Sequence, residues 1–284
     1  MKGIILAGGD GTRLSPVTIS YSKQLLPVYD KPLIYYPLST LMNLDIREIL
    51  IICKSNQLKN FQNLLGDGAQ FGLNIIYKIQ DEPRGIAEAI IIGSEFIKND
   101  SLALILGDNI FHGHNLNRKK LFFDKKNDAM IFLYKVQNPD QYGVANFKKN
   151  RLISIHEKPK HPTSNQAVTG LYFYREGVVK YAKKLKPSKR GELEITDLNN
   201  LYIKKNKMSY IELSETSVWF DAGTTSALLS ASEYVKAIQE RNNILISSPE
   251  YISYKKNFIN KINFKKIIKN NINNSYFNYL RNQK

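Results

Sequence analysis

The chain has 284 residues, of which 43% are hydrophobic and 23% are charged, and its formal net charge is +16. These proportions are typical of a globular protein with one large domain, or with one domain and an appendage. A membrane-spanning protein is excluded because no apolar run approaches the ~20 residues of a membrane helix. A disulfide framework is excluded because Cys53 is the single cysteine. We expect a cytoplasmic, soluble protein with Cys53 in its core.

The first half of the chain alternates strand-like and helix-like segments. Continuous apolar runs predict strands buried on both faces, with helical periodicity between them. The expected strands are 2–7, 48–53, 74–79 and 102–106, and the expected helices are 32–44, 57–65 and 85–96. Repeated β-α-β units predict an α/β, Rossmann-like three-layer fold, with a mainly parallel central sheet and helices on both faces. Ligands of such sheets bind beyond the carboxyl ends of the strands.

The second half has a more mixed pattern and ends in a basic tail. Its expected strands are 129–135, 144–147, 152–156, 168–174 and 217–220, and its expected helices are 178–185, 194–204 and 225–241. After Glu250 the chain carries eight Lys or Arg residues and no Asp or Glu. This segment therefore supplies half of the net charge. A solvated helical surface is the favoured interpretation. Nucleic-acid binding is the alternative, but the tail lacks the interleaved aromatic and basic residues that stack on bases.

A glycine-rich segment follows the first expected strand. Gly8, Gly9 and Gly11 allow positive φ and close backbone approach, so that several amides can point at an anion. Arg13 adds a guanidinium suited to phosphate oxygens. The dehydrogenase pattern G-x-G-x-x-G fits poorly because Leu14 stands in place of the third glycine, and no Gly-Lys-Ser/Thr of a P-loop follows. The segment predicts a polyphosphate-binding loop, with a flexible turn as the alternative.

Two aspartates come directly after apolar strands. Asp108 follows the strand 102–106, and Asp221 follows the strand 217–220. Carboxylate oxygens at strand ends suit Mg²⁺. The alternative is that either aspartate caps a helix, since Asp221 lies just before an expected one. We expect both to be metal ligands.

Further motifs occur in order from the N-terminus to about Glu250. They are LAGGDGTRL (6–14), SKQLLPV (22–28), KPLIYY (31–36), LGDG (65–68), LGDNIF (106–111), YGV (142–144), EKP (157–159), AVTGLYFY (167–174) and RGELEITD (190–197). This series resembles the sugar-phosphate nucleotidyltransferases, and within them the glucose-1-phosphate thymidylyltransferases. The resemblance implies Mg²⁺-dependent transfer of a nucleotidyl group from dTTP to glucose 1-phosphate, which gives dTDP-glucose and pyrophosphate.

The same resemblance implies a domain organisation and a homotetramer. The nucleotidyltransferase domain would cover 1–247, with a nucleotide half over about 1–110 and a sugar-phosphate half over about 111–247. The segment 248–284 would be a basic helical appendage. The product would enter dTDP-rhamnose or related deoxysugar synthesis, and neither a membrane nor a nucleic acid is an expected partner.

Each matching position carries an implied role. Arg13 and Lys23 would brace the triphosphate, and Lys158 would bind the sugar phosphate. Asp108 and Asp221 would hold Mg²⁺. The further nucleotide-binding positions are Gly8, Gly11, Thr12, Gln24, Gln80, Gly85 and Glu88, and the further sugar-phosphate positions are Asn109, Tyr142, Gly143, Glu157 and Val168. No carboxylate base is needed, because the attacking phosphate oxygen is already ionised.

Four positions depart from the family pattern. Glu88 stands where glutamine is common, and because a carboxylate only accepts hydrogen bonds, we expect a weakened or altered base preference. Thr225 replaces a histidine next to the second metal position. Tyr251 replaces a glutamate and Lys255 an arginine in the segment that matches a feedback site at a subunit interface. Catalysis should survive the changes at Tyr251 and Lys255, whereas feedback control is left open.

The histidines do not have the spacing of a zinc motif, so loop or interface roles are expected for them. They are His112, His114, His156 and His161. Two other functions remain as alternatives. One is the same chemistry with UTP, CTP or another hexose 1-phosphate. The remoter one is a non-catalytic nucleotide-sugar-binding regulator, against which the intact catalytic and metal positions argue.

Overall fold

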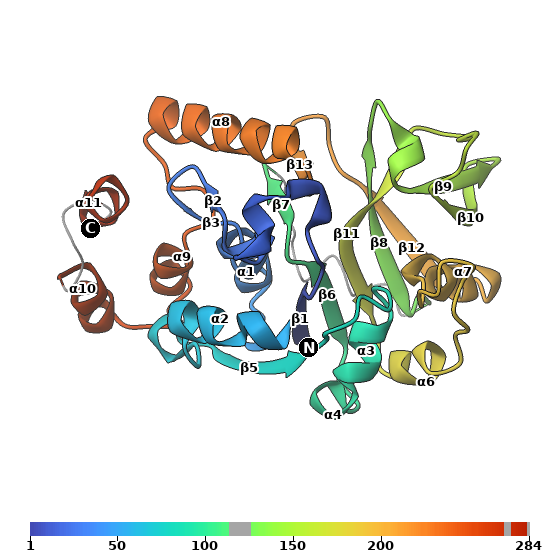
Figure 1. Cartoon of the computed structure of the whole chain (residues 1–284), viewed down its shortest axis with the longest axis horizontal. Coiled ribbons are helices and arrows are strands. Elements are labelled where there is room, and N and C mark those ends of the chain that lie inside the picture. Colours follow the sequence, from blue (N-terminus) through green and yellow to red (C-terminus); the bar gives the residue numbers. More distant parts are fainter. Residues whose placement is uncertain (114–125, 270–273, 283–284) are drawn as a thin grey trace.

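A nine-stranded sheet crosses the part of the molecule that the structure, a computed structural model, describes: residues 1–113, 126–269 and 274–282 (Figure 1). Its first half consists of parallel strands. In spatial order these are β6 (Leu102–Leu106), β1 (Lys2–Ala7), β4 (Glu48–Cys53) and β5 (Asn74–Ile79). All have the bounds expected from their apolar runs, and Cys53 is buried as expected.

The second half of the sheet is joined to the first by an antiparallel strand. β11 (Gln166–Tyr174) lies between β6 and the strands of the second half. Those strands are β8 (Ala129–Lys135), β9 (Gly143–Lys148), β10 (Arg151–Glu157) and β12 (Met208–Glu212). Most of their pairs are antiparallel, and β12 lies parallel to β8. The predicted α/β class with a large central sheet is confirmed.

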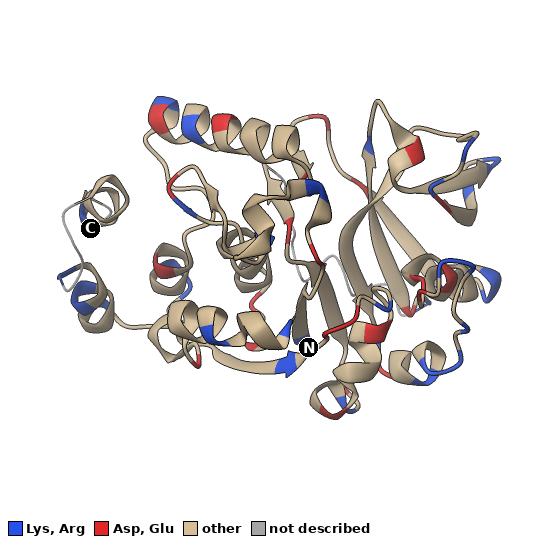
Figure 2. Cartoon of the chain, in the orientation of Figure 1, with Lys and Arg blue, Asp and Glu red and all other residues tan. Residues whose placement is uncertain are grey.

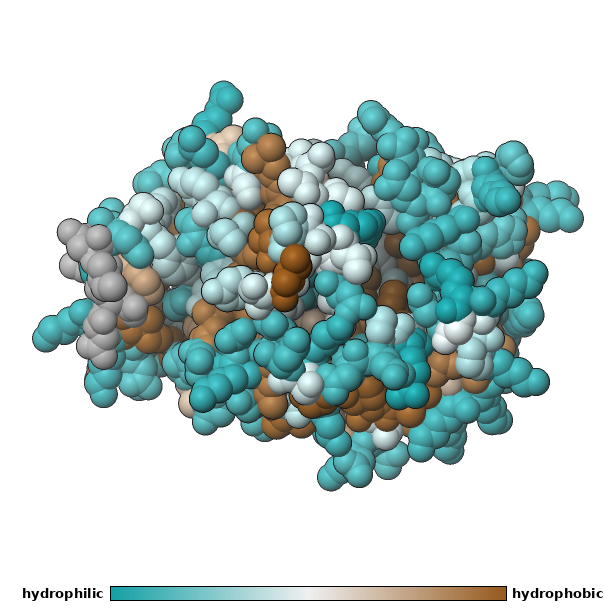
Figure 3. Space-filling model, viewed as in Figure 1, coloured by the Kyte–Doolittle hydropathy of each residue, from teal (hydrophilic) through white to brown (hydrophobic). Residues whose placement is uncertain are grey.

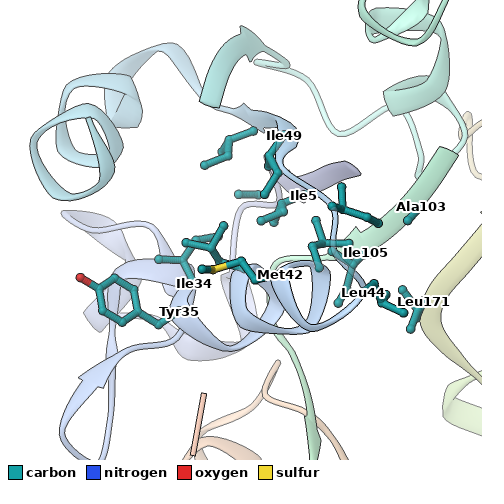
Figure 4. Close-up of a cluster of buried hydrophobic side chains, with 14 of the residues drawn as sticks. Ile5, Ile34, Tyr35, Met42, Leu44, Ile49, Ala103, Ile105 and Leu171 are labelled. Atoms are coloured by element: carbon teal, nitrogen blue, oxygen red, sulfur yellow. The ribbon is translucent and has the colours of Figure 1, made fainter. Parts of the chain in front are cut away.

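Helices cover both faces of the sheet. One face carries α1 (Tyr35–Asn43) and α2 (Leu58–Leu65), and the other carries α3 (Glu88–Ile92), α4 (Ser94–Ile97), α6 (Val178–Ala182) and α7 (Ile195–Lys204). Side chains alternate along each strand, so Ile5 of β1 packs under α1 while Ile4 packs on the opposite face. Figure 4 shows Ile5 and Ile105 of the sheet beside Met42 of α1. The three layers match the prediction.

Several elements differ from the expected ones. The helix expected over 85–96 begins only at Glu88, after Gly85 with its φ of +103°, and is divided into two helices at Gly93. A Cβ on Gly93 would lie 2.6 Å from Ile4 Cδ1, so glycine permits close packing on β1. The helix expected over 32–44 begins at Tyr35, after a short hairpin of β2 (Pro27–Val28) and β3 (Lys31–Pro32).

The chain ends in four helices within the described residues. They are α8 (Thr225–Asn242), α9 (Pro249–Lys255), α10 (Lys261–Lys269) and α11 (Ser275–Asn282). α9 packs against α1, and Phe264, Tyr276 and Leu280 form a small buried cluster between the last helices. Of these helices, α10 and α11 lie at the opposite end of the molecule from β9 and β10 (Figure 1).

Basic side chains and hydrophobic side chains both occur on several parts of the surface. Figure 2 shows Lys and Arg on α10 and also around α6 and α7, so the basic surface extends beyond the tail. On the face shown in Figure 3, hydrophobic residues form separate patches among hydrophilic ones. Among the described residues, the helices are too short or too polar to span a bilayer.

Candidate active site

The two strand-end aspartates meet at the carboxyl end of β6. A separate pair of strands, β7 (Asn109–His112) and β13 (Val218–Asp221), brings them together by pairing Asn109 with Asp221. The Ala222 N–H donates to the Asp108 carbonyl oxygen at 3.0 Å, which fixes the two turns against each other. Both carboxylates therefore reach one cavity.

Asp221 does not cap the helix that follows it. The N-cap of α8 is Thr224, whose Oγ1 accepts a hydrogen bond from the Ala227 N–H at 3.2 Å. The alternative role considered for Asp221 is therefore wrong, and its carboxylate is left to face the cavity. Burial and the nearby Asp108 charge raise the pKa of Asp221 to about 6, against the opposing charges of Lys23, Arg13 and Lys158.

Lys23 is the ion-pair partner of Asp108. Its short 3-10 helix (Lys23–Leu25) places Nζ in a hydrogen bond with Asp108 Oδ2. Burial alone would raise the pKa of Asp108, but the charge of Lys23 and hydrogen bonds from Lys23 and Asn109 outweigh it, so the pKa is lowered. Asp108 is therefore held as a carboxylate beside a cation, while Asp221 is the more basic of the two.

The glycine-rich loop carries Arg13 into the same cavity. Gly11 has a φ of +63°, and its carbonyl oxygen accepts from Thr18 Oγ1 at 2.8 Å, so the chain turns at once into the 3-10 helix Thr12–Leu14. Arg13 then passes over Gly223. A Cβ on Gly223 would lie 2.6 Å from Arg13 Nη2 and 3.1 Å from Asp221 Oδ1. A side chain at this position would therefore crowd both the guanidinium and the carboxylate.

The cavity has a volume of about 220 Å³ and is lined by both halves of the chain. Among its lining residues are the predicted Arg13, Asp108, Asn109, Tyr142, Gly143, Glu157, Lys158, Val168 and Asp221. Residues from β6, β7, β9, β10, β11 and β13 thus converge, although they are up to about 200 positions apart in the sequence. The convergence gives one site lined by three carboxylates (Asp108, Glu157 and Asp221) and two cations (Arg13 and Lys158).

Glu157 is anchored by residues to which no role was assigned from sequence. Thr196 Oγ1 donates to Glu157 Oε2 at 2.6 Å, and Arg190 Nη2 lies 3.7 Å from Glu157 Oε1. Arg190 is held in turn by Glu194, 2.9 Å from its Nη2. The motif RGELEITD contains these residues. Its match to the family was the only sign in the sequence that they matter, and only the fold shows that the motif faces Glu157.

Asn109 braces Asp108. Its Oδ1 accepts from Trp219 Nε1 at 2.6 Å and from the Gly170 N–H at 3.0 Å, and its Nδ2 donates to Asp108 Oδ1 at 3.0 Å. A Cβ on Gly170 would lie 2.5 Å from Asn109 Oδ1. Asn109 thus orients the Asp108 carboxylate from within the core, and its contact with a sugar stays a prediction.

The predicted nucleotide-binding positions gather beside the glycine-rich loop. A Cβ on Gly8 would lie 2.8 Å from Gln80 Oε1, and Gln80 Nε2 donates to Glu88 Oε2 at 2.7 Å. Gly85 adjoins them, with its carbonyl oxygen 3.5 Å from Gln80 Nε2. Gln24 is buried against Gly107, whereas Thr12 is exposed. The structure brings together the four residues expected around the base.

Comparison with known proteins shows which family the chain is similar to. A family profile described as nucleotidyl transferase matches residues 2–238. The chain belongs to the nucleotidyl transferase family. A glucose-1-phosphate thymidylyltransferase of Neisseria meningitidis serogroup A is 47% identical over 99% of this chain and 98% of its own length, and one of Mycolicibacterium smegmatis is 46% identical over 99% and 98%.

Solved structures are similar over most of the chain. A putative glucose-1-phosphate thymidylyltransferase from Bacillus anthracis, solved in complex with a sucrose, has a TM-score of 0.78 and 44% identity, covering 82% of this chain and 94% of that one. A UDP-glucose pyrophosphorylase with UDP-glucose has a TM-score of 0.72 at 24% identity, over 83% and 98%, and supports the fold alone. The chain is therefore a nucleotidyltransferase enzyme.

The histidines of this nucleotidyltransferase lie away from the aspartate pair where they are described. His112 Nδ1 is 2.7 Å from the Tyr234 hydroxyl, and His156 Nε2 is 3.2 Å from Ser154 Oγ. His161 is exposed, and His114 lies outside the described residues. Within the described ranges, no three His, Cys, Asp or Glu side chains are grouped as metal ligands.

The two departures in the C-terminal segment line a second cavity of about 490 Å³. Tyr251 and Lys255 of α9 face Thr40 and Asn43 of α1 across it. Lys255 Nζ lies 5.4 Å from the centre of the Tyr251 ring, so the two substituted residues contact each other. Whether this nucleotidyltransferase retains feedback control there stays an open prediction.

Proposed function

We propose that this nucleotidyltransferase transfers a thymidylyl group from dTTP to α-D-glucose 1-phosphate, giving dTDP-glucose and pyrophosphate. The observation that carries the proposal is the single cavity in which Asp108, Asp221, Arg13 and Lys158 converge from both halves of the chain. The names of relatives 46% and 47% identical over 99% of the chain support these two substrates. The proposal includes the expected homotetramer, a cytoplasmic location and a product used for dTDP-rhamnose or related deoxysugars.

The donor set fits Mg²⁺. Two carboxylates converge, and within the described residues they are not part of a larger group of metal-binding side chains. Mg²⁺ is usually held by one or two carboxylates together with substrate phosphates and water. Asp108 and Asp221 would hold it. When bound, the ion would neutralise charge on the phosphates of the nucleotide.

In the proposed reaction, an oxygen of the sugar 1-phosphate attacks the α-phosphorus of dTTP. A new P–O bond forms to that oxygen, the bond between the α-phosphorus and the bridging oxygen breaks, and pyrophosphate leaves with the electron pair. Lys158, exposed at the rim with a φ of +42°, would position the sugar phosphate. Arg13 and Lys23 would stabilise the triphosphate and its leaving group.

Sugar recognition would depend on Glu157 and its neighbours. Thr196 and Arg190 orient the Glu157 carboxylate, which can accept hydrogen bonds from sugar hydroxyls. Gly143 lies beside it, since a Cβ there would be 3.4 Å from Glu157 Oε2. A side chain at Gly143 would therefore narrow the space over the carboxylate. The contact between half-buried Tyr142 and buried Trp219, with ring centroids 5.3 Å apart, closes one wall.

A substrate panel tests the proposed function. Pyrophosphate release is measured with dTTP, UTP, CTP, ATP and GTP, each combined with glucose, galactose and mannose 1-phosphates. We expect dTTP with glucose 1-phosphate to give the highest kcat/KM. A clear preference for UTP or CTP, or for another sugar, would replace the proposed substrates while keeping the chemistry. No pyrophosphate with any pair would contradict the enzyme assignment itself.

Gly223→Ala is expected to lower kcat/KM for dTTP about tenfold, because the new methyl group would displace the Arg13 guanidinium by an ångström or more. The fold should tolerate it, since the crowded groups, the Arg13 guanidinium and the Asp221 carboxylate, are the ends of side chains that line the cavity. We expect the free energy of unfolding to change by less than about 1 kcal/mol. Ser226→Ala, at the exposed start of α8, serves as the control. An unchanged kcat/KM in Gly223→Ala would argue against a role for Arg13.

A further inference from the structure

The orientation of the Gln80 side-chain amide is determined by its surroundings. Gln80 is 6% exposed. Its Nε2 donates to Glu88 Oε2 at 2.7 Å and lies 3.5 Å from the Gly85 carbonyl oxygen. Its Oε1 is turned toward Gly8, where a Cβ would be only 2.8 Å away. Both amide hydrogens are therefore directed away from Gly8, and the face beside the glycine-rich loop presents an acceptor.

Glu88 is the reason why this orientation is the stable one. A carboxylate offers only acceptors, so the reversed amide would place Gln80 Oε1 against Glu88 Oε2 at hydrogen-bond distance with no hydrogen between them. The carboxylate is itself held by Arg84, whose Nε lies 3.1 Å from Glu88 Oε1 one turn away. Glu88 is largely buried, with 13% of its side chain exposed, so the unfavourable contact would be poorly screened by water.

We propose that Glu88, held by Arg84, is a positioning residue that fixes Gln80 with its carbonyl toward the base and so favours a pyrimidine with an N–H donor at N3. Thymine and uracil carry that hydrogen, whereas cytosine has a lone pair at N3 that would face the Gln80 oxygen. The inference rests on the proposed function, because it takes the base to lie between Gly8 and Gln80. It replaces the expectation that the Glu88 carboxylate itself faces the base.

The test compares kcat/KM for dTTP and dCTP, each with glucose 1-phosphate, in the wild type and in Glu88→Gln. The introduced amide can turn either way, so it can accept from Gln80 or donate to it, and Gln80 becomes free to offer its N–H₂ to cytosine. We expect the ratio of dTTP to dCTP to fall about tenfold. A merely structural defect would lower both values together and leave the ratio unchanged.

Two further variants make the result decisive. Glu82→Gln is the matched control, because Glu82 is an exposed carboxylate 3.7 Å from the same Arg84 and contacts neither Gln80 nor Glu88 in the described structure. Its ratio should equal that of the wild type. Arg84→Gln changes a side chain that is 65% exposed and should fold normally. We expect a smaller fall of the ratio, about threefold, in the same direction.

The outcomes separate the inference from the proposed function. A wild type that uses neither nucleotide, or that prefers dCTP, contradicts the proposed function and this inference with it. A wild type that prefers dTTP, with the same ratio in Glu88→Gln and Arg84→Gln, contradicts the role of Glu88 alone. If Glu88→Gln fails to fold, Arg84→Gln decides, and an unchanged ratio there overturns the inference.

Discussion

Asp108→Asn is expected to lower kcat about 1000-fold at saturating dTTP, glucose 1-phosphate and Mg²⁺. The substitution keeps the shape of the side chain, so the hydrogen bond from Asn109 and the packing under β6 have a similar partner. It removes the negative charge that pairs with Lys23 and that would hold the metal with Asp221. Steady-state pyrophosphate release measures the loss.

Asp45→Asn is the matched control for this experiment. Asp45 also pairs with a lysine, with Lys256 Nζ 2.6 Å from its Oδ1, but the pair lies on the surface near α9. Its kcat should stay within about twofold of the wild type, because exposed ion pairs contribute little. Circular dichroism should show the same fold in both variants. A kcat within tenfold of the wild type in Asp108→Asn would contradict the role of this carboxylate.

Glu250→Ala is expected to lower the free energy of unfolding by about 3 kcal/mol. Glu250 is buried at the start of α9, where its Oε2 accepts from Ser248 Oγ at 3.0 Å and from the Tyr276 hydroxyl at 2.5 Å. Tyr276 belongs to α11, so the carboxylate links the last helix of the chain to α9 and, through it, to α1. Removing the carboxylate leaves a cavity, and the Ser248 and Tyr276 hydroxyls lose their acceptor. Urea denaturation followed by fluorescence measures the change.

The surface residue Glu240 provides the comparison for Glu250. It also accepts from a tyrosine, with the Tyr29 hydroxyl 3.1 Å from its Oε1, but this pair is exposed. Glu240→Ala should change the free energy of unfolding by less than about 0.5 kcal/mol. Equal effects of the two variants would mean that the C-terminal helices do not depend on Glu250. The segment 248–284 would then behave as the loosely attached appendage that its weak sequence pattern suggested.

The buried strands and the strand-end residues were predictable from sequence because their signals are local. β1, β4 and β6 are continuous apolar runs, as parallel strands covered on both faces must be. Asp108 and Asp221 interrupt such runs, and an unexplained carboxylate there is visible without a structure. The short strand β12 (Met208–Glu212) escaped prediction because its sequence, MSYIE, has neither a long apolar run nor a clear alternation.

Contacts between residues far apart in the chain could not be predicted from the sequence. Lys23 and Asp108 are 85 positions apart, and Glu157 and Thr196 are 39 apart, so their pairing depends on how the strands stack. The same applies to Glu88. From the sequence alone, the Glu88 carboxylate was expected to face the base, because the sequence shows which side chain has changed but not what it contacts. In the structure Glu88 is bound by Gln80 and Arg84, and the Gln80 oxygen is turned toward Gly8, contacts that the sequence does not reveal.

The most direct test is to follow the proposed reaction itself by ³¹P nuclear magnetic resonance. The purified chain is incubated with dTTP and glucose 1-phosphate, with Mg²⁺ and separately with excess EDTA. We expect dTDP-glucose and pyrophosphate in equal amounts with Mg²⁺ and neither with EDTA. The absence of dTDP-glucose in the presence of Mg²⁺, or its undiminished formation in EDTA, would contradict a metal-assisted thymidylyl transfer at the Asp108–Asp221 site.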